Sequence, residues 1–193
     1  MPLEPMDPTA AAVVDLWRQL DGDTRGHLVR VGRLAYDLAG HIGLTAEERA
    51  DSGLGGLLHD IGKLGIPHEV VAKAAPLSLP ERQLMRSHPD LGARWLEAVL
   101  GPGVLGAIRH HHERMDGRGY PDGVRAATLP TVCRLVAVVD TYDAITADRP
   151  YHVACSPAEA CRELRSVAGL QLDPELVEGL IDLERRRLEG LAA

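Results

Sequence analysis

The sequence of 193 residues contains no phenylalanine, and aromatic residues make up only 3% of it. We therefore expect a core built mainly from leucine, valine, isoleucine and alanine. No apolar run approaches the roughly 18 residues that a membrane-spanning helix needs. The N-terminus also lacks the basic-then-apolar pattern of a signal peptide. These absences predict a cytoplasmic protein.

Cysteine is scarce as well. Cys133, Cys155 and Cys161 form no CxxC pair, and Cys133 lies in an apolar run. The sequence therefore predicts neither a disulfide framework nor a thiolate-bound zinc site.

The chain is acidic overall. Lys and Arg number 21 against 28 Asp and Glu, which gives a net charge of −7. That charge argues against nucleic-acid polymers and anionic membranes as partners. A small phosphorylated ligand stays compatible with it, because bound metal ions can reverse the local field.

The chain has ordinary proportions of apolar (45%) and charged (25%) residues for one globular domain. We expect a Pro-rich tail or linker remnant at 1–9 and a single domain at 10–190. Apolar residues recur at helical spacing, which predicts an all-α fold. Residues 113–129, rich in Gly, Arg and Asp, are expected to form a loop. The expected helices cover 11–20, 28–42, 45–61, 78–100, 104–112, 132–145, 157–168 and 174–188.

Helix boundaries are predicted from capping residues. Asp23 or Thr24 is expected to cap the second helix, Thr45 the third and Ser78 the fourth. The β-branched content of 132–145 would also permit a strand. We predict a helix there because its apolar residues persist for about four turns and Asp140 and Asp143 share one helical face.

Polar residues interrupt the apolar pattern after residue 58, where His59, Asp60 and Lys63 follow one another at helical spacing. Burying an imidazole and a carboxylate is costly unless they pair or bind a metal ion. A metal site with an ammonium group nearby suits phosphate chemistry. From this segment alone, a buried His–Asp hydrogen bond beside a surface lysine is an equally good interpretation.

A second polar segment begins with three consecutive histidines, 110–112, and continues into a Gly-rich stretch at 116–123. His111 and His112 at a helix end could serve two neighbouring metal ions, although a solvated patch is the simpler interpretation of a histidine run. The glycines permit close backbone approach to a ligand, and Tyr120 adds a rigid ring and a hydroxyl. Asp140 ends an apolar run, where a metal ion would stabilise its buried carboxylate.

Three further residues, His27, His88 and Arg149, are candidate site residues when they are considered together with these segments. His27 and His88 are each more typical of structural histidines when taken alone. They complete a cluster of histidines and carboxylates without cysteine, a donor set that suits Mn, Fe, Ni or Zn. The other members of the cluster are His59, Asp60, His111, His112 and Asp140. Arg149, in an Arg-Pro-Tyr sequence, suits phosphate or guanine recognition, the alternative being a surface ion pair.

The ordered motifs resemble a known family. The series contains His27, HDIGKxGIP starting at His59, His88, HHExxDGxGYP starting at His111, Asp140 and RPY starting at Arg149. From about Asp23 to Leu180 it resembles the HD-GYP subgroup of HD-domain phosphohydrolases. The resemblance implies an all-helical HD-domain bundle with an irregular GYP loop. It also implies a phosphodiesterase that hydrolyses cyclic di-GMP to pGpG, and in many members to GMP, through a metal-bridging hydroxide.

The resemblance also implies roles for single residues. It assigns one metal ion to His27, His59, Asp60 and Asp140, and a second to His88, His111 and His112, with Asp60 bridging. Lys63 matches the lysine beside the scissile phosphate, so Lys63 and Asp60 are the expected catalytic residues. The expected substrate-binding residues are Gly119, Tyr120, Arg149 and Lys63.

The expected cofactors are two divalent ions, Fe or Mn. Asp23 stands where some members carry a glutamate that supports a third metal, so a three-metal site stays open. His152 stands where Lys or Arg commonly follows RPY, which leaves the ligand affinity open. A homodimer, or an upstream regulatory domain or partner protein, is compatible with the sequence.

Two other functions compete with the phosphodiesterase. One is a low-activity cyclic di-GMP receptor module, which His152 favours and the intact ligand set disfavours. The other is an HD hydrolase of another nucleotide, which the GYP loop disfavours.

Overall fold

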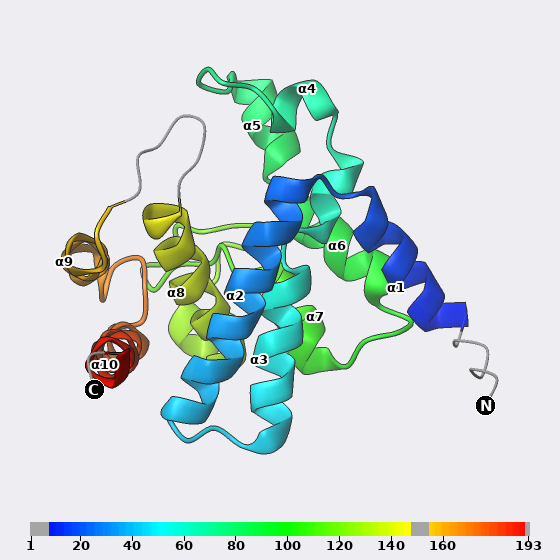
Figure 1. Cartoon of the computed structure of the whole chain (residues 1–193). Helices are drawn as coiled ribbons and strands as arrows, with labels where there is room; N and C mark the ends of the chain where they lie inside the picture. Colours follow the sequence, from blue (N-terminus) through cyan, green and yellow to red (C-terminus); the bar gives the residue numbers. More distant parts are fainter. Residues whose placement is uncertain (1–7, 148–154, 192–193) are drawn as a thin grey trace, which may run out of the picture.

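The computed structural model describes residues 8–147 and 155–191, and within them it contains α-helices, two short 3-10 helices and no β-strand (Figure 1). The predicted all-α fold is confirmed. The elements in chain order are α1 (Pro8–Gln19), α2 (Gly22–His41), α3 (Ala46–Leu58), η1 (Ile61–Gly65), α4 (His68–Val71), α5 (Leu79–Met85), α6 (His88–Leu96), α7 (Pro102–His110), η2 (Ala126–Thr128), α8 (Thr131–Thr146), α9 (Pro157–Val167) and α10 (Pro174–Leu191).

Several boundaries follow the local signals. Thr45 and Ser78 each cap a helix through a reciprocal capping box, as predicted. The segment after Pro130 is the helix α8, most of which is buried, so the helical interpretation is confirmed. The predicted cap of α2 was wrong. Asp21 caps that helix instead, its carboxylate accepting the Thr24 N–H at 2.8 Å.

Two predicted helices were too long. The third ends at Leu58 and gives way to the 3-10 turn η1, and the helix expected over 78–100 is divided into α5 and α6. Pro89 explains the division, because its nitrogen has no hydrogen to donate to the Met85 carbonyl. His88 Nδ1 lies 2.7 Å from that carbonyl oxygen and takes the place of the missing donor. The break places the His88 ring in the interior, where it is 1% exposed.

The helices pack around two apolar clusters, and α2 contributes to both. Leu38, Val139 and Leu180 lie in the cluster that joins α2 to α8, α9 and α10. Leu28 and Ile108 lie in the cluster that joins α2 to α3, η1, α6 and α7. Figure 1 shows α2 and α3 in the centre, with α8–α10 on one side and α1, α6 and α7 on the other. Side chains from the helices of both clusters can therefore converge near the N-terminal end of α2.

Glycines let α2 and α3 cross closely. A Cβ on Gly32 would lie 2.9 Å from the Gly53 carbonyl oxygen, and one on Gly56 would lie 3.0 Å from the Gly32 Cα. Only hydrogen fits at such distances, so these positions determine how near the two backbones come. As a result, the ring centroids of His27 on α2 and of His59, the C-cap residue of α3, are 5.2 Å apart.

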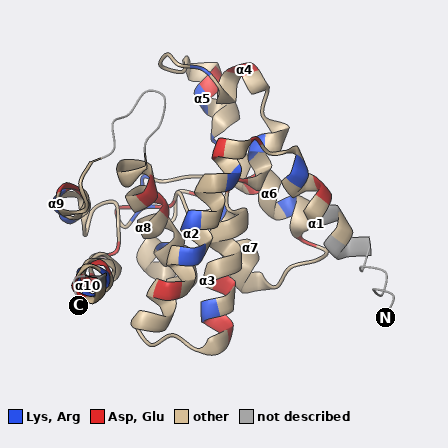
Figure 2. Cartoon of the chain, in the orientation of Figure 1, with Lys and Arg blue, Asp and Glu red and all other residues tan. Residues whose placement is uncertain are grey.

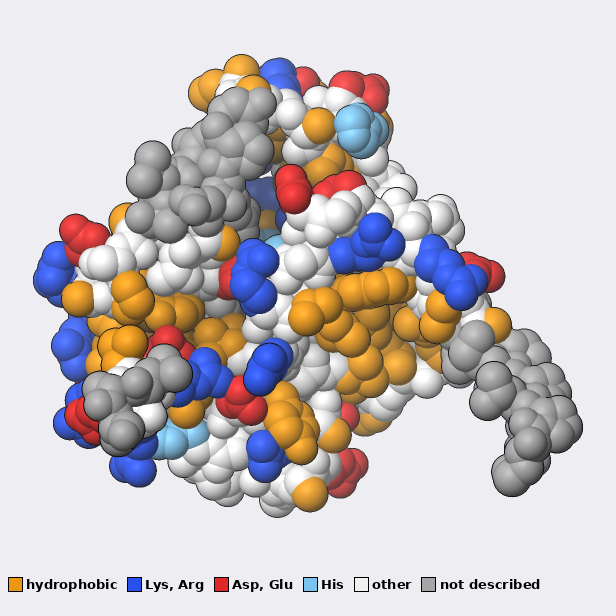
Figure 3. Space-filling view, in the orientation of Figure 1, with side chains coloured by type: hydrophobic (Ala, Val, Ile, Leu, Met, Phe, Trp, Pro, Cys, Tyr) orange, Lys and Arg blue, Asp and Glu red, His pale blue; other side chains and the backbone are white. Residues whose placement is uncertain are grey.

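Charged side chains of both signs are interspersed over the visible helices and do not form one basic face (Figure 2). The space-filling view shows hydrophobic side chains gathered between α1 and the α2–α3 pair (Figure 3). Within the described part of the chain, no helix combines the length and apolar character needed to span a bilayer.

Candidate metal centre

Three histidines of the site share one hydrogen-bonding arrangement. In His59, His88 and His111, Nδ1 lies 2.7–2.8 Å from the carbonyl oxygen of the residue three positions earlier. Each of these carbonyls is at or near a helix end, where backbone acceptors lack intrahelical partners. Since a carbonyl only accepts, Nδ1 must carry the hydrogen and Nε2 is the atom left for a ligand. Backbone contacts of this kind orient metal-binding histidines.

Asp60 lies between the histidines and presents a different oxygen to each side. Its Oδ1 is 3.1 Å from His88 Nε2 and 4.0 Å from His111 Nε2. Its Oδ2 is 3.5 Å from His59 Nε2, and it accepts a hydrogen bond from Lys63 Nζ at 2.6 Å. The carboxylate is 3% exposed. Burial alone would raise its pKa, but Lys63 and the neighbouring histidines outweigh burial and hold the pKa well below its usual range. Asp60 is therefore a buried anion that two ligand groups share.

His27, on α2, lies on the side of the site that Asp60 Oδ2 faces. Its Nε2 lies 3.2 Å from Asp140 Oδ1 and 3.9 Å from Asp60 Oδ2. On the other side of the ring, Nδ1 lies 2.7 Å from Asp143 Oδ2, and Arg30 holds that carboxylate with two hydrogen bonds. Burial lowers the pKa of His27, but the two aspartates outweigh it and raise the pKa to about 9. This side of the site therefore favours positive charge.

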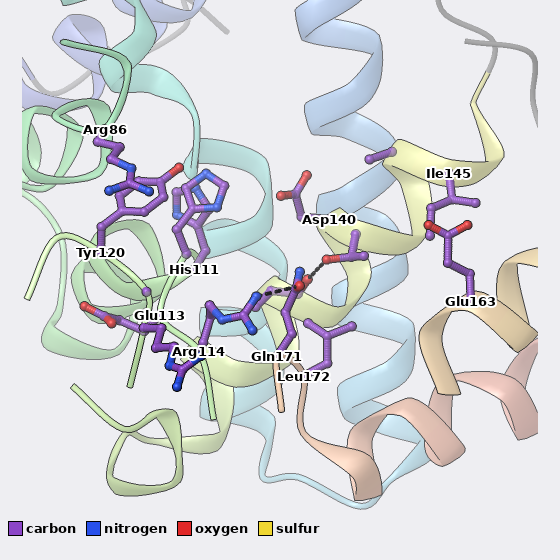
Figure 4. A pocket seen from close by; sticks show the side chains of 16 residues that line it. Arg86, His111, Glu113, Arg114, Tyr120, Asp140, Ile145, Glu163, Gln171 and Leu172 are labelled. Carbon is purple, nitrogen blue, oxygen red and sulfur yellow. Dashed lines mark hydrogen bonds between the residues drawn. The ribbon is translucent and has the colours of Figure 1, made fainter. Parts of the chain in front are cut away.

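His112 and Tyr120 form the boundary with an open cavity. Their rings stack with centroids 4.6 Å apart, and the Arg86 guanidinium lies 5.2 Å from the Tyr120 centroid. Burial lowers the pKa of His112 to about 4, so it is neutral near pH 7. Burial raises the pKa of the Tyr120 hydroxyl, which therefore remains a hydrogen-bond donor. Figure 4 shows Arg86, Tyr120 and His111 close together, with Asp140 facing them across the cavity.

The cavity has a volume of about 500 Å³, within the range of about 300–1,000 Å³ typical of small-molecule sites. Arg86 and Arg118 are exposed at its wall, and no ion pair of either side chain occurs within 8–147 and 155–191. Arg114 also lines it but is bonded to Asp116 and Gln171. Two guanidinium groups are thus available for an anionic ligand beside the His/Asp cluster.

The donor atoms fit metal ions. Two sets have ligand atoms within 4.8 Å of one another, namely His27, His59 and Asp60, and Asp60, His88, His111 and His112. His59 Nε2 and Asp60 Oδ1 are buried without hydrogen-bond partners. His88 Nε2 and His111 Nε2 are 3.3 Å apart. Two nitrogens at about 2.0–2.1 Å from one tetrahedral or octahedral ion would have a comparable separation. A cation bound by each set would give these unpaired atoms a partner.

The predicted site residues fall into three groups. The structure brings together His27, His59, Asp60, Lys63, His88, His111, His112, Tyr120 and Asp140, with Gly119 in the cavity wall. Asp23 is exposed and belongs to neither set. Arg149 and His152 lie outside the described residues.

Sequence reasoning missed Arg30, Arg86 and the contact of Asp143 with His27. Arg30 lies three residues after His27, a helical spacing that could have indicated it. Asp143 also forms an ion pair with Arg30. Nothing in the sequence indicates that Arg86 faces the cavity.

The HD domain family matches residues 15–176. The chain is 39% identical over 163 residues to a cyclic di-GMP phosphodiesterase of Pseudomonas aeruginosa, covering 83% of this chain and 39% of that protein. It is 34% identical to 3'3'-cGAMP-specific phosphodiesterase 1 of Vibrio cholerae, covering 89% of this chain and 39% of that protein. The chain thus spans about two fifths of the length of these relatives.

Among solved structures, the chain is similar to Bd1817, an HDG"Y"P protein from Bdellovibrio bacteriovorus. The TM-score is 0.70 with 24% identity, and the match covers 91% of this chain and 57% of that one. This likeness concerns the fold. The protein belongs to the HD domain family, and the resemblance to HD-GYP phosphodiesterases seen in the motifs is confirmed.

Proposed function

We propose that this chain is a metal-dependent phosphodiesterase that hydrolyses cyclic di-GMP to linear pGpG, with GMP as a further product. The observation that carries the proposal is the position of Asp60 between two histidine groups, with unpaired donor atoms on both sides. The similarity to cyclic di-GMP phosphodiesterases at 39% identity supports the choice of substrate.

His27, His59, Asp60 and Asp140 would hold one cation, and His88, His111 and His112 a second, with Asp60 between them. Fe or Mn suits this set of imidazoles and carboxylates. Metal analysis of the loaded protein tests for a third ion near Asp23. When bound, two adjacent cations supply Lewis acidity, which lowers the pKa of a water molecule and stabilises charge on phosphate oxygens.

The protein's own residues orient and neutralise the substrate. Lys63 Nζ donates one hydrogen bond to Asp60, and an ammonium group has two further N–H bonds for phosphate oxygens. Arg86 and Arg118 lie where a second phosphate or a guanine could bind. Arg149, from the same chain, is proposed as a further ligand of the dinucleotide.

In the reaction, a water molecule gives up one proton to solvent, its oxygen bonds to phosphorus, and the bond from phosphorus to the 3′ oxygen breaks. The departing 3′ oxygen takes a proton, for which Lys63 or a water molecule beside it is the proposed donor. The Tyr120 ring, stacked on His112, shapes the pocket at the GYP loop. Gly119 lets the loop approach closely, since a Cβ there would lie 2.4 Å from the His112 carbonyl oxygen.

A second substrate has specific support: 3'3'-cGAMP, the substrate named for a relative at 34% identity. Parallel assays with cyclic di-GMP, 3'3'-cGAMP and a nucleoside monophosphate, with products separated chromatographically, distinguish the candidates. We expect the highest kcat/KM for cyclic di-GMP. Preference for 3'3'-cGAMP would change the substrate. A metal-loaded protein that binds cyclic di-GMP without turnover would instead be a receptor module.

The cellular setting completes the proposal. All three cysteines are free in the structure, which suits a reducing cytoplasm. A homodimer or an additional regulatory domain is proposed as the source of regulation, because the relatives are more than twice the length of their matched segments.

A further inference from the structure

A third group of potential ligands lies at the C-terminal end of α7, outside the two sets proposed for catalysis. It consists of His110, Glu113 and Asp122, each of which places one ligand atom within 4.8 Å of the others. The three residues come from the helix end and from the two ends of the loop that carries Gly119 and Tyr120. None of them belongs to the motif positions assigned to metal binding or to substrate.

Glu113 is the buried centre of this group, with 3% of its surface exposed. Its Oε1 accepts the backbone N–H groups of Asp122 at 2.8 Å and Gly123 at 2.9 Å. Its Oε2 is buried and has no hydrogen-bond partner, and no ion pair to Glu113 occurs within the described ranges. Figure 4 shows the Glu113 carboxylate directed away from Asp140. A buried carboxylate oxygen without a partner is costly, which calls for a ligand at this position.

His110 supplies a second atom without a partner. Its Nδ1 is buried, makes no hydrogen bond and lies 3.5 Å from Asp122 Oδ2. Successive residues of a helix project about 100° apart. His110 therefore faces this group, whereas the next residue, His111, lies 4.0 Å from Asp60 in the candidate metal centre. A nitrogen and a carboxylate oxygen thus face the same point without sharing a hydrogen.

The charges around the group leave it negative. Arg109 donates to both oxygens of Asp122 and also bonds to Asp90. Arg94 pairs with Asp90 as well. Three carboxylates, counting Glu113, therefore face two guanidinium groups. Each carboxylate oxygen keeps a lone pair after its hydrogen bond to Arg109, so Asp122 can bind a cation while the ion pair persists.

We propose that His110, Glu113 and Asp122 bind a divalent cation, separate from the candidate metal centre. One imidazole and two carboxylates form a donor set that suits Zn²⁺ or Mn²⁺. The ion would connect the end of α7 to both ends of the 113–123 loop. It would thereby hold in place the loop that presents Gly119 and Tyr120 to the cavity. The proposal is independent of the substrate.

Metal binding in a chain whose main ligands are removed tests the proposal directly. The double variant His59→Ala/His88→Ala removes ligands from both sets of the candidate metal centre. After equilibrium dialysis against Mn²⁺, elemental analysis should find one tightly held Mn per chain. Electron paramagnetic resonance should show the six-line spectrum of an isolated Mn²⁺. Adding Glu113→Gln should abolish both signals.

Glu113→Gln is the informative change, because an amide oxygen can still accept the two backbone N–H groups while its NH₂ cannot bind a cation. His68→Ala, at an exposed histidine, is the matched control and should retain the ion. Circular dichroism verifies folding, and His110→Ala decides the question if Glu113→Gln fails to fold. Equal Mn content with and without these changes would overturn the proposal, and a water molecule would then occupy the position.

Discussion

Nε2 of His88 lies 3.1 Å from Oδ1 of Asp60, yet no hydrogen bond joins them. The ring's hydrogen is on Nδ1, which faces the Met85 carbonyl oxygen at 2.7 Å. Two electron-rich atoms therefore face each other in a buried site, an arrangement that a cation stabilises. The same holds for His59 Nε2 on the other side of the carboxylate.

The first prediction concerns Asp60 itself. Asp60→Asn removes the negative charge that both histidine groups share, so the metal content of the candidate metal centre should fall from about two ions to less than one. Hydrolysis should fall by more than about 100-fold. Changing a residue that only hydrogen-bonds to a metal ligand already costs roughly 10–100-fold in metal affinity. Asp15→Asn, on the exposed face of α1, is the control. Retained metal and turnover in Asp60→Asn would contradict the assignment of Asp60 as a ligand.

The second prediction assigns a positioning role to Asp143, which orients His27 through Nδ1 and is itself held by Arg30. Asp143→Asn should weaken metal affinity by about 10–100-fold while leaving kcat at saturating metal nearly unchanged. Activity measured against metal concentration separates the two effects. The matched control is Asp182→Asn. Asp182 likewise pairs with a histidine, His41, at a distance of 3.0 Å, but this pair lies outside the site. Equal metal dependence in both variants would show that Asp143 serves packing alone.

Arg86 provides a test of the substrate site. If its guanidinium binds a phosphate, Arg86→Ala should raise KM about 10-fold with little change in kcat, because a charge-assisted hydrogen bond contributes roughly 1.5–3 kcal/mol. Arg82→Ala, at an exposed position on α5, should behave as wild type. Steady-state kinetics with cyclic di-GMP gives the answer. An unchanged KM would remove Arg86 from the binding site.

Gly119 should separate loop geometry from metal binding. A Cβ at this position would lie 2.4 Å from the His112 carbonyl oxygen and 2.5 Å from the Glu113 Cα, so Gly119→Ala must displace the loop. We expect a loss of cyclic di-GMP affinity by calorimetry with the metal content preserved. Gly22→Ala, where a Cβ meets nothing within 4 Å, is the control. Full affinity in Gly119→Ala would show that the loop does not need this close contact.

The sequence predicted the helical class and most segments because helical periodicity and capping boxes are local signals. Thr45 and Ser78 illustrate this, since each cap depends on a glutamate three residues later. The division between α5 and α6 was missed although Pro89 was visible, because apolar residues continue at helical spacing across it. The division also depends on His88 Nδ1, which faces the Met85 carbonyl oxygen in place of the missing backbone N–H.

Site residues that carry recognisable motifs were predictable, and residues that act through tertiary contacts were not. His27 and Asp143 are 116 positions apart in the chain and meet only because α2 packs on α8. The close crossing at Gly32 and Gly56 likewise depends on two helices at once. For Asp23, the place of a glutamate in some family members suggested a ligand, whereas in the structure Asp23 is exposed and belongs to neither set of ligand atoms.

The most direct test is hydrolysis of cyclic di-GMP by protein reconstituted anaerobically with Mn²⁺ or Fe²⁺, with metal content measured on the same sample. We expect turnover to pGpG when the candidate metal centre holds about two ions, and none after chelation. The third site proposed above can add one ion to the count, so the Glu113→Gln variant is analysed in parallel. A fully loaded site that leaves cyclic di-GMP intact would contradict the central claim.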